Sequence, residues 1–358
     1  MSVVGLALEG GGAKGAYHMG VVKAYLETGH SFNAIAGTSI GAINAAIIAQ
    51  GDFDSGYRMW EAIDTRSIFD MSDDEYNLLL NRKLDTRALR RLAALTHKLI
   101  VSRGINTRKM RQLIASVVDE EKLRKAKVDF GLVTLSLTDR KPYELFKSSI
   151  PQGQLVDYLL ASATFPGFQP TVIGNKAYID GGLYDNCPIN MLAGNGYKHV
   201  VAVRTGAIGI SRKIQYPDIA LTTILPSEPL GGIMSFNPIS IRRSLEMGYY
   251  DAIRVLKGLQ GRIYCIDVGS VSEEMCKEML DSLPDDRVLG IGRMLGMSGM
   301  SPRELWRLAI VPKLSRIMRL PADASAMTFI IRLTEALAAA KGMNKYKIYT
   351  FNGWLPGS

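Results

Sequence analysis

Residues 3–15 carry a short apolar run that leads straight into a glycine-rich loop, Val3-Val4-Gly5-Leu6-Ala7-Leu8-Glu9-Gly10-Gly11-Gly12-Ala13-Lys14-Gly15. The apolar run is long enough for one buried strand and too short for a helix. After the glycines, Met19, Val22 and Leu26 recur at helical spacing, which predicts a helix over residues 16–27. The loop therefore joins a strand to a helix N-terminus, where unpaired N–H groups and the helix dipole favour a negative charge.

A second strand–turn–helix passage follows. Residues 32–36 are predicted to form a strand, residues 42–50 are predicted to form a helix of small residues, and between them stands Gly37-Thr38-Ser39-Ile40-Gly41. This is the context of a nucleophile elbow, in which glycines permit a sharp turn and leave the serine hydroxyl uncovered. In the alternative interpretation Ser39 only caps a helix. The preceding strand and the glycine on each side favour the elbow.

A carboxylate follows much later, in Asp180-Gly181-Gly182. Residues 176–179 are predicted to form a strand that delivers Asp180 into a glycine turn. A free aspartate, with a pKa of about 3.9, is a weak base toward a serine hydroxyl, but burial in a water-poor cleft raises that pKa. An ordinary Asp-Gly turn is the alternative. Together, the three motifs supply what ester hydrolysis needs: backbone donors for an oxyanion, a nucleophilic hydroxyl and a base.

Histidine is the usual partner of a catalytic serine, and this chain has four, His18, His30, His97 and His199. Only His199 follows Asp180, as the chain order of α/β-hydrolases requires. However, Ser39 follows the second predicted strand rather than a later one, and His199 directly precedes the apolar residues 200–203, which read as a strand. We therefore predict a Ser39–Asp180 dyad without histidine. A histidine-assisted esterase for small soluble esters stays an alternative.

In this order the motifs resemble the patatin-like phospholipases, a family of acyl hydrolases. Two further stretches carry the resemblance, which spans about residues 3–205: Ala161-Ser162-Ala163-Thr164-Phe165-Pro166-Gly167-Phe168-Gln169-Pro170 and Asp185-Asn186-Cys187-Pro188-Ile189. The resemblance implies an α/β fold of three layers, with a central mixed β-sheet flanked by helices.

The resemblance also implies roles for single residues. It makes Ser39 the nucleophile and Asp180 the base, with no metal or organic cofactor. It assigns the oxyanion hole to the loop Gly10-Gly11-Gly12-Ala13-Lys14-Gly15, with the amides of Gly11 and Gly12 nearest the oxyanion. Glu9 stands where the family often has Asp, a departure that we do not expect to affect the chemistry.

Dinucleotide binding is a competing interpretation, because residues 10–15 also fit the pattern G-x-G-x-x-G. That fingerprint requires an acidic residue at the end of the second strand, about 20 residues further on. Here the second predicted strand ends in Ala36-Gly37-Thr38-Ser39, without a carboxylate, and no Gly-Lys-Ser/Thr ending makes the loop a P-loop. Both observations disfavour a nucleotide site.

Composition is typical of a soluble enzyme with a large core, since 47% of the 358 residues are hydrophobic. We expect a catalytic domain over residues 1–270 and a mostly helical C-terminal extension over residues 271–358, whose role stays open. Met1-Ser2 leads straight into the first strand without a visible secretory signal. The three cysteines show no metal-like spacing. A cytoplasmic location is therefore predicted, and peripheral contact with the inner face of the membrane stays open.

Net charge is +9, and residues 82–127 hold 14 Lys/Arg against 4 Asp/Glu. This segment is predicted to form basic amphipathic helices. They could cap the cleft and dock on anionic phospholipid, or present an ordinary solvated face. The segment lacks interleaved aromatic residues, so no nucleic-acid partner is expected.

The C-terminal third yields fewer predictions. Residues 263–268 are predicted to add a last strand to the central sheet. Residues 304–320 form an amphipathic pattern that Pro312 should break.

The sequence as a whole predicts a serine acyl hydrolase, of the phospholipase A or lipid acyl hydrolase type, acting on phospholipid or another acyl lipid at a membrane surface. A homo-oligomer and a small-molecule or protein activator both stay open. A catalytically silent or signal-gated lipid-binding module is the alternative from another class.

Overall fold

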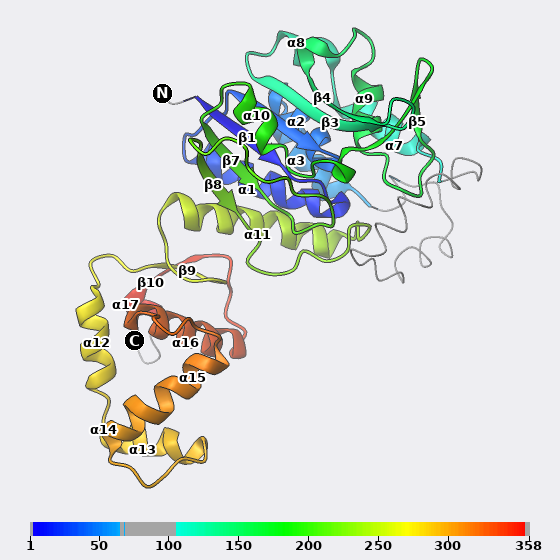
Figure 1. Ribbon diagram of the computed structural model, residues 1–358. Helices are drawn as coiled ribbons and strands as arrows, with labels where there is room; N and C mark the ends of the chain where they lie inside the picture. Colours follow the sequence, from blue (N-terminus) through cyan, green and yellow to red (C-terminus); the bar gives the residue numbers. More distant parts are fainter. Residues whose placement is uncertain (1–2, 65–67, 69–104, 355–358) are drawn as a thin grey trace. The chain divides into compact units, whose positions relative to one another are not determined.

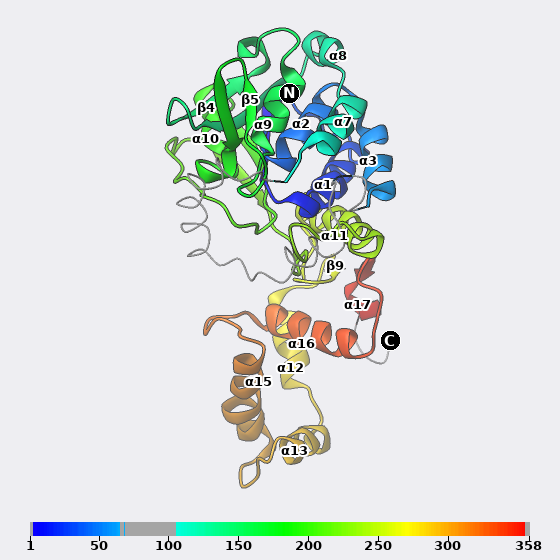
Figure 2. The ribbon, with the colours of Figure 1, turned by 90° about the vertical axis from the view of Figure 1, so that its right-hand side faces the viewer.

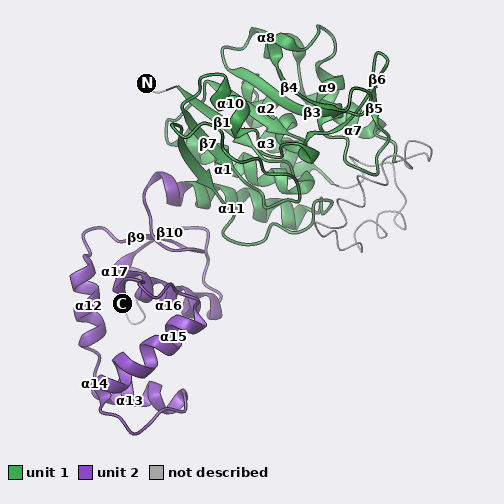
Figure 3. Cartoon of the chain, in the orientation of Figure 1, with its two compact units in different colours: residues 1–252 green, residues 253–358 purple. Residues whose placement is uncertain are grey.

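The computed structural model describes residues 3–64, 68 and 105–354 of the chain. The chain divides into two compact units, residues 1–252 and 253–358 (Figure 3). The division falls within one long helix, α11 (Pro238–Leu256). Assignment of the catalytic function to residues 1–270 stays a prediction.

The first unit contains a mixed β-sheet with helices on both faces (Figure 1). Its strands are β1 (Val4–Leu8), β2 (Ala34–Thr38), β3 (Asp129–Ser136), β4 (Lys141–Phe146), β5 (Thr171–Ile173), β6 (Lys176–Asp180), β7 (His199–Val203) and β8 (Ala220–Ile224). They lie in the order β5-β6-β3-β2-β1-β7-β8, and β4 pairs with β3. The five strands β1, β2, β3, β7 and β8 are parallel, whereas β4 and β6 run antiparallel to β3. The predicted α/β fold with a mixed central sheet is confirmed.

The helices of this unit follow the strands closely along the chain. They are α1 (Ala16–Glu27), α2 (Ile40–Ala49), α3 (Phe53–Ala62), α7 (Arg108–Val117), α8 (Glu120–Lys125), α9 (Leu155–Ser162), α10 (Ile189–Gly194) and α11. The helix predicted over residues 16–27 coincides with α1. The helix predicted over residues 42–50 begins two residues earlier, because it starts directly after Ser39.

Alternation of side chains explains the layers. On one face of the sheet, Ala7, Ala36 and Val133 form a buried cluster with Met191 and Leu192 of α10. Successive residues of a strand point to opposite faces, so Leu6 and Leu8 point to the other face of the sheet. Strands buried on both sides read as nearly continuous apolar runs, which is why the first strand was visible in the sequence.

Helices α1 and α11 lie against each other, as the views in Figures 1 and 2 agree. The Tyr17 hydroxyl of α1 donates a hydrogen bond to the carboxylate of Asp251 in α11, at 3.0 Å. This contact joins residues 234 positions apart.

Strand β3 decides where the ends of two other strands meet. Thr38 of β2 pairs with Val133, and Asp180 of β6 pairs with Thr134, the next residue along β3. Both strands lie on the same edge of β3, because β4 covers residues 131–136 on the other edge. Since β2 is parallel and β6 antiparallel to β3, their carboxyl ends face each other. Ser39, which directly follows the last residue of β2, therefore lies beside Asp180, the last residue of β6.

The second unit is mostly helical, with a small parallel sheet of two strands. Its elements are β9 (Cys265–Asp267), α12 (Glu273–Asp281), α13 (Asp285–Met294), α14 (Pro302–Glu304), α15 (Val311–Ile317), α16 (Ala326–Ala340), β10 (Ile348–Thr350) and α17 (Phe351–Trp354). The prediction that residues 263–268 extend the central sheet is wrong, because β9 pairs with β10 inside this unit.

Pro312 does not break its helix, contrary to the sequence prediction. A π-helical segment, Leu305–Ile310, joins α14 to α15 without interruption. The wider hydrogen-bond pattern of a π segment accommodates a residue that lacks an N–H group. Among the described residues, no helix combines the length and the apolar character needed to cross a bilayer.

Candidate active site

Ser39 occupies a sharp turn between β2 and α2. Its backbone has φ 58° and ψ −130°, a conformation that is uncommon for any residue with a side chain. The turn packs tightly, since a Cβ on Gly41 would lie 2.3 Å from the carbonyl oxygen of Leu8. The Thr38 hydroxyl donates to the carbonyl of Asp185, at 2.8 Å, and thereby ties the turn to the segment after β6.

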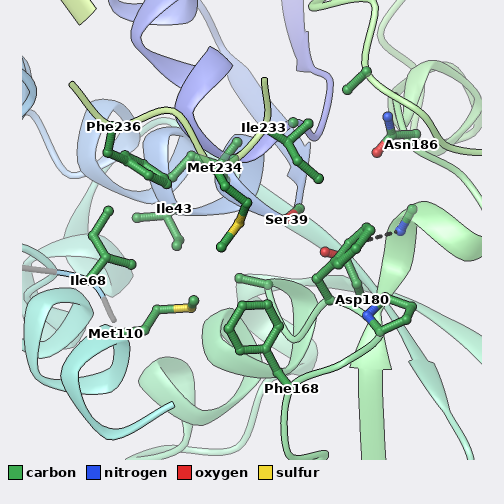
Figure 4. Close-up of a pocket in the computed structure, with 18 of the residues that line it drawn as sticks. Ser39, Ile43, Ile68, Met110, Phe168, Asp180, Asn186, Ile233, Met234 and Phe236 are labelled. Carbon is green, nitrogen blue, oxygen red and sulfur yellow. Dashed lines mark hydrogen bonds between the residues drawn. The ribbon is translucent and has the colours of Figure 1, made fainter. Parts of the chain in front are cut away.

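Asp180 lies beside Ser39 in Figure 4 and is 3% exposed. Its Oδ1 accepts a hydrogen bond from the amide of Gly182, at 2.7 Å. Burial raises the pKa of Asp180 to about 6, while hydrogen bonds with the Ser39 side chain and the Gly182 amide act in the opposite direction. The structure thus brings the hydroxyl and the carboxyl of the two sequence motifs together.

The glycine-rich loop lines the same pocket through Gly11 and Gly12. The amides on either side are engaged, since Gly10 N–H donates to Asn186 O at 2.9 Å and Ala13 N–H donates to Ile233 O at 2.7 Å. Within the described ranges, the Gly11 and Gly12 amides donate to no backbone carbonyl. Both residues line the pocket together with Ser39, at the start of the helical turn Gly12–Gly15 that precedes α1.

Glu9 anchors the beginning of this loop and is 2% exposed. Its Oε2 accepts hydrogen bonds from the amides of Thr205 and Gly206, at 2.6 and 3.0 Å, and its Oε1 lies 2.9 Å from Nε of Arg204. Lys14 Nζ donates to the carbonyl of Gly206, at 3.0 Å. The loop is thus held to the segment after β7, almost 200 positions later, which no local pattern signals.

A second buried anchor lies at the other end of the loop, where Asn44 Nδ2 donates to the carbonyl of Gly15 at 2.9 Å. Trp60 Nε1 donates to Asn44 Oδ1 at 2.9 Å, and Nδ1 of His18 lies 3.3 Å from Asn44 Nδ2. Burial lowers the pKa of His18 to about 3, so its ring is neutral at physiological pH. Sequence reasoning missed this network, whose one available signal is a single asparagine in an otherwise apolar helix.

Apart from Ser39, Asp180 and Asn186, the side chains that line the pocket are apolar. Asp180 is the one charged side chain among the described residues that line it. In Figure 4, Ile68 and Met110 lie across the pocket from Asp180. Met110 belongs to α7, so part of the predicted basic helical insertion does border the pocket. Residues 82–104 of that insertion, with the apolar and basic positions expected between them, lie outside the described residues.

None of the described histidines lines this pocket. His199 begins β7 and pairs with Val4, whereas Val203 pairs with Leu8 at the end of the sheet where Ser39 lies. The two ends of such a strand are about 13 Å apart. His30 is exposed and contacts Thr28, and His97 lies outside the described residues.

Comparison with known proteins points to one family. The family model described as patatin-like phospholipase matches residues 6–193. A patatin-like phospholipase domain-containing protein of Caenorhabditis elegans is 23% identical over 275 residues, which is 74% of this chain and 18% of that protein. A lysophospholipase of Aspergillus terreus is 53% identical over 47 residues, 13% of this chain and 3% of that protein. The matches therefore span only a small part of these relatives.

Solved structures with some similarity include two bacterial proteins. VipD from Legionella pneumophila aligns with 97% of this chain and 89% of its own, with 16% identity and a TM-score of 0.46. ExoU, in its complex with SpcU from the type III secretion system of Pseudomonas aeruginosa, aligns with 95% of this chain and 63% of its own, with 17% identity and a TM-score of 0.37.

Proposed function

The chain belongs to the patatin-like phospholipase family, and on this premise we propose that it is a serine acyl hydrolase that cleaves fatty-acyl esters of phospholipids or other acyl lipids. One observation carries the proposal. Ser39, the buried carboxyl of Asp180, Gly11 and Gly12 all border one pocket whose other lining side chains are apolar except for Asn186.

The proposed reaction is acyl transfer to water in two steps. In the first, Asp180 accepts the proton of Ser39 Oγ while that oxygen attacks the ester carbonyl, and the tetrahedral oxyanion accepts hydrogen bonds from Gly11 and Gly12. Collapse of this intermediate breaks the ester bond, and the leaving alcohol takes the proton from Asp180. In the second step, Asp180 accepts a proton from water, which attacks the acyl-serine. Collapse of this second intermediate breaks the bond to Ser39 Oγ, which takes the proton back from Asp180 as the fatty acid leaves.

The surroundings of Asp180 suit the role of base. A general base works best when its pKa lies near the operating pH, and burial raises the pKa of Asp180 to about 6. Such a carboxyl is still mostly ionised at pH 7, yet it holds a proton far more tightly than a free aspartate does. In this proposal no histidine takes part.

The lining of the pocket supports an acyl chain as the part of the substrate that is bound. Ile43, Met110, Phe168, Met234 and Phe236 surround the space next to Ser39 (Figure 4). A chain of methylene groups gains about 0.8 kcal/mol for each CH₂ that it buries. None of the described residues that line the pocket has a cationic side chain that could bind a lipid head group. We therefore expect substrate selectivity to depend on the acyl chain.

Access from a membrane is the last part of the proposal. Helix α7, which borders the pocket through Met110 and Ile114, also carries Arg108 and Arg111, both exposed, and Arg111 forms an ion pair with Asp157. Basic residues near an anionic membrane surface each contribute about 1 kcal/mol of attraction. We therefore propose that the enzyme works at the cytoplasmic face of a membrane, with α7 near the lipid.

The test combines a fluorophosphonate probe with release of fatty acid from phospholipid vesicles. The wild-type protein is expected to bind the probe at Ser39 and to release fatty acid, whereas S39A and D180A should lose both activities. S148A is a matched control, because Ser148 is an exposed serine that neither lines the pocket nor belongs to α7. Vesicle binding without labelling or release would favour the alternative, a catalytically silent lipid-binding module.

A further inference from the structure

The amide of Ser39 has an unusual partner. Because Ser39 lies at φ 58° and ψ −130°, its N–H points away from the hydrogen-bond pattern of both β2 and α2. Instead it donates to the side-chain oxygen of Ser162, at 3.0 Å. The strained turn is therefore held by a side chain 123 positions further along the chain.

Ser162 is the last residue of α9 and is fully buried. Its hydroxyl donates to the carbonyl of Val133 in β3, at 2.7 Å, while its oxygen accepts from the Ser39 amide. One hydroxyl thus connects the nucleophile's backbone to the central strand, with its proton and a lone pair both in use.

The carbonyl of Val133 lies where β2 ends and β6 ends on the same edge of β3. Gly181, directly after Asp180, packs on this carbonyl so closely that a Cβ on Gly181 would lie 2.2 Å from the Val133 oxygen. The Val133 carbonyl therefore contacts the turn that carries Asp180 directly, and it is linked to the turn that carries Ser39 through the hydroxyl of Ser162. The position of one turn relative to the other depends on this shared point.

We propose that Ser162 is a positioning residue, which holds the Ser39 hydroxyl at the distance and angle from Asp180 that proton transfer requires. The inference rests on the proposed function, since it assigns a role within that reaction. Ser162 touches neither the substrate nor the proton that moves. It acts through the backbone of Ser39.

Loss of this hydroxyl has a specific consequence for catalysis. Without Ser162 Oγ, the Ser39 amide and the Val133 carbonyl both lose a buried partner, and the strained turn relaxes. A misplacement of about 1 Å in a catalytic group costs about 100-fold in rate. Binding of the acyl chain is unaffected, because Ser162 does not line the pocket. We therefore expect kcat to fall while KM stays the same.

A matched control separates this role from a merely structural one. Ser136 is also fully buried in β3, and its hydroxyl likewise accepts from a backbone amide, that of Asp139, and donates to an oxygen, the Asp139 carboxylate. S136A removes the same kind of hydrogen bonds as S162A without touching the two turns.

The experiment compares S162A, S162C and S136A with wild type on a soluble chromogenic ester such as p-nitrophenyl butyrate. S162A is expected to lose about 100-fold in kcat with KM within about twofold, and S162C, whose thiol is a weaker donor and acceptor, should fall between S162A and wild type. The melting temperatures of S162A and S136A should both fall, because each loses buried hydrogen bonds, but S136A should keep kcat within about twofold of wild type.

The pH profile is a second readout that a structural role would not move. Burial and the hydrogen bonds of Ser39 and Gly182 account for the pKa of Asp180, with no charged group of the described residues contributing. If Ser39 moves away, the pKa of Asp180 rises further. The acid limb of kcat/KM in S162A should therefore shift to higher pH, and that in S136A should stay in place.

The outcomes separate the two proposals. A kcat in S162A no lower than in S136A, with an unchanged acid limb, would refute the positioning role while leaving the proposed function intact. Full activity in S39A would instead contradict the proposed function. If S162A fails to fold at the assay temperature, S162C decides the question by the same two readouts.

Discussion

Replacement of Asp180 by Asn is expected to make the protein inactive and, above pH 6, more stable. Burial raises the pKa of Asp180 from 3.8 to about 6. The folded state therefore binds this proton more tightly than the unfolded chain does. Stability contributed by the neutral carboxyl is fully present below about pH 4 and is lost as the pH rises through about 6.

The magnitude follows from the shift. A difference of about two pKa units corresponds to about 3 kcal/mol in the free energy of unfolding. Asparagine has the same shape, carries no charge and can still accept the hydrogen bond from the Gly182 amide. D180N should thus equal wild type in stability at pH 4 and exceed it by about 3 kcal/mol at pH 8.

Urea unfolding of both proteins between pH 4 and pH 8, followed by circular dichroism, measures this difference. Asp185, whose pKa burial also raises to about 6, is present in both proteins and cancels from the comparison. D139N is a control of opposite sign, since hydrogen bonds with Lys176 and Tyr143 lower the pKa of Asp139 to about 2. Its stability relative to wild type should fall as the pH rises from about 2 to about 4, so its unfolding is also measured in that range, and it should stay constant between pH 4 and pH 8. A D180N protein that is less stable than wild type at pH 8, or whose advantage does not vary with pH, would contradict the reasoning.

Three further outcomes are expected. G12A should unfold more easily and lose at least about tenfold in activity, because Gly12 has φ 55° and a Cβ there would lie 2.2 Å from the carbonyl oxygen of Ile233. A normal melting temperature and normal hydrolysis would mean that the loop can rearrange. H199A should retain at least about a tenth of wild-type activity, because His199 lies at the opposite end of its strand from the pocket; a strong loss with unchanged circular dichroism would argue for a histidine mechanism. M110W should fill the pocket and reduce hydrolysis of long-chain p-nitrophenyl esters about tenfold or more, while short-chain esters react as before. Overpacking should lower the free energy of unfolding by about 1–3 kcal/mol. An equal loss of activity for both chain lengths would place the acyl chain elsewhere.

Local features of the site could be predicted because each depends on a few neighbouring residues. The strand, glycine loop and helix of residues 4–27 follow from an apolar run, from glycines and from helical spacing. The sharp turn at Ser39 follows from Gly37 and Gly41 in the same way. The sequence did not determine which strands pair. Residues 263–268, for example, were predicted to join the central sheet but do not, since an apolar run does not specify which sheet it joins.

Other parts of the site have no local signature. Sequence reasoning treated Glu9 as a neutral departure, yet its carboxylate holds the glycine loop to Thr205 and Gly206. It quoted Ser162 only as part of a resemblance, although that hydroxyl supports the amide of Ser39. These contacts join residues more than 100 positions apart, and only packing brings them together.

By itself, the sequence determined which residues are the candidates for the proposed chemistry, because a sharp turn around a serine and a glycine-flanked carboxyl are properties of short segments. Only the tertiary structure decided that Ser39 and Asp180 meet. That meeting depends on β2 and β6 ending head to head along one edge of β3, at Val133 and Thr134. Strand register of this kind is set by the burial of whole faces and by hydrogen bonds between distant segments, and no single motif contains that information.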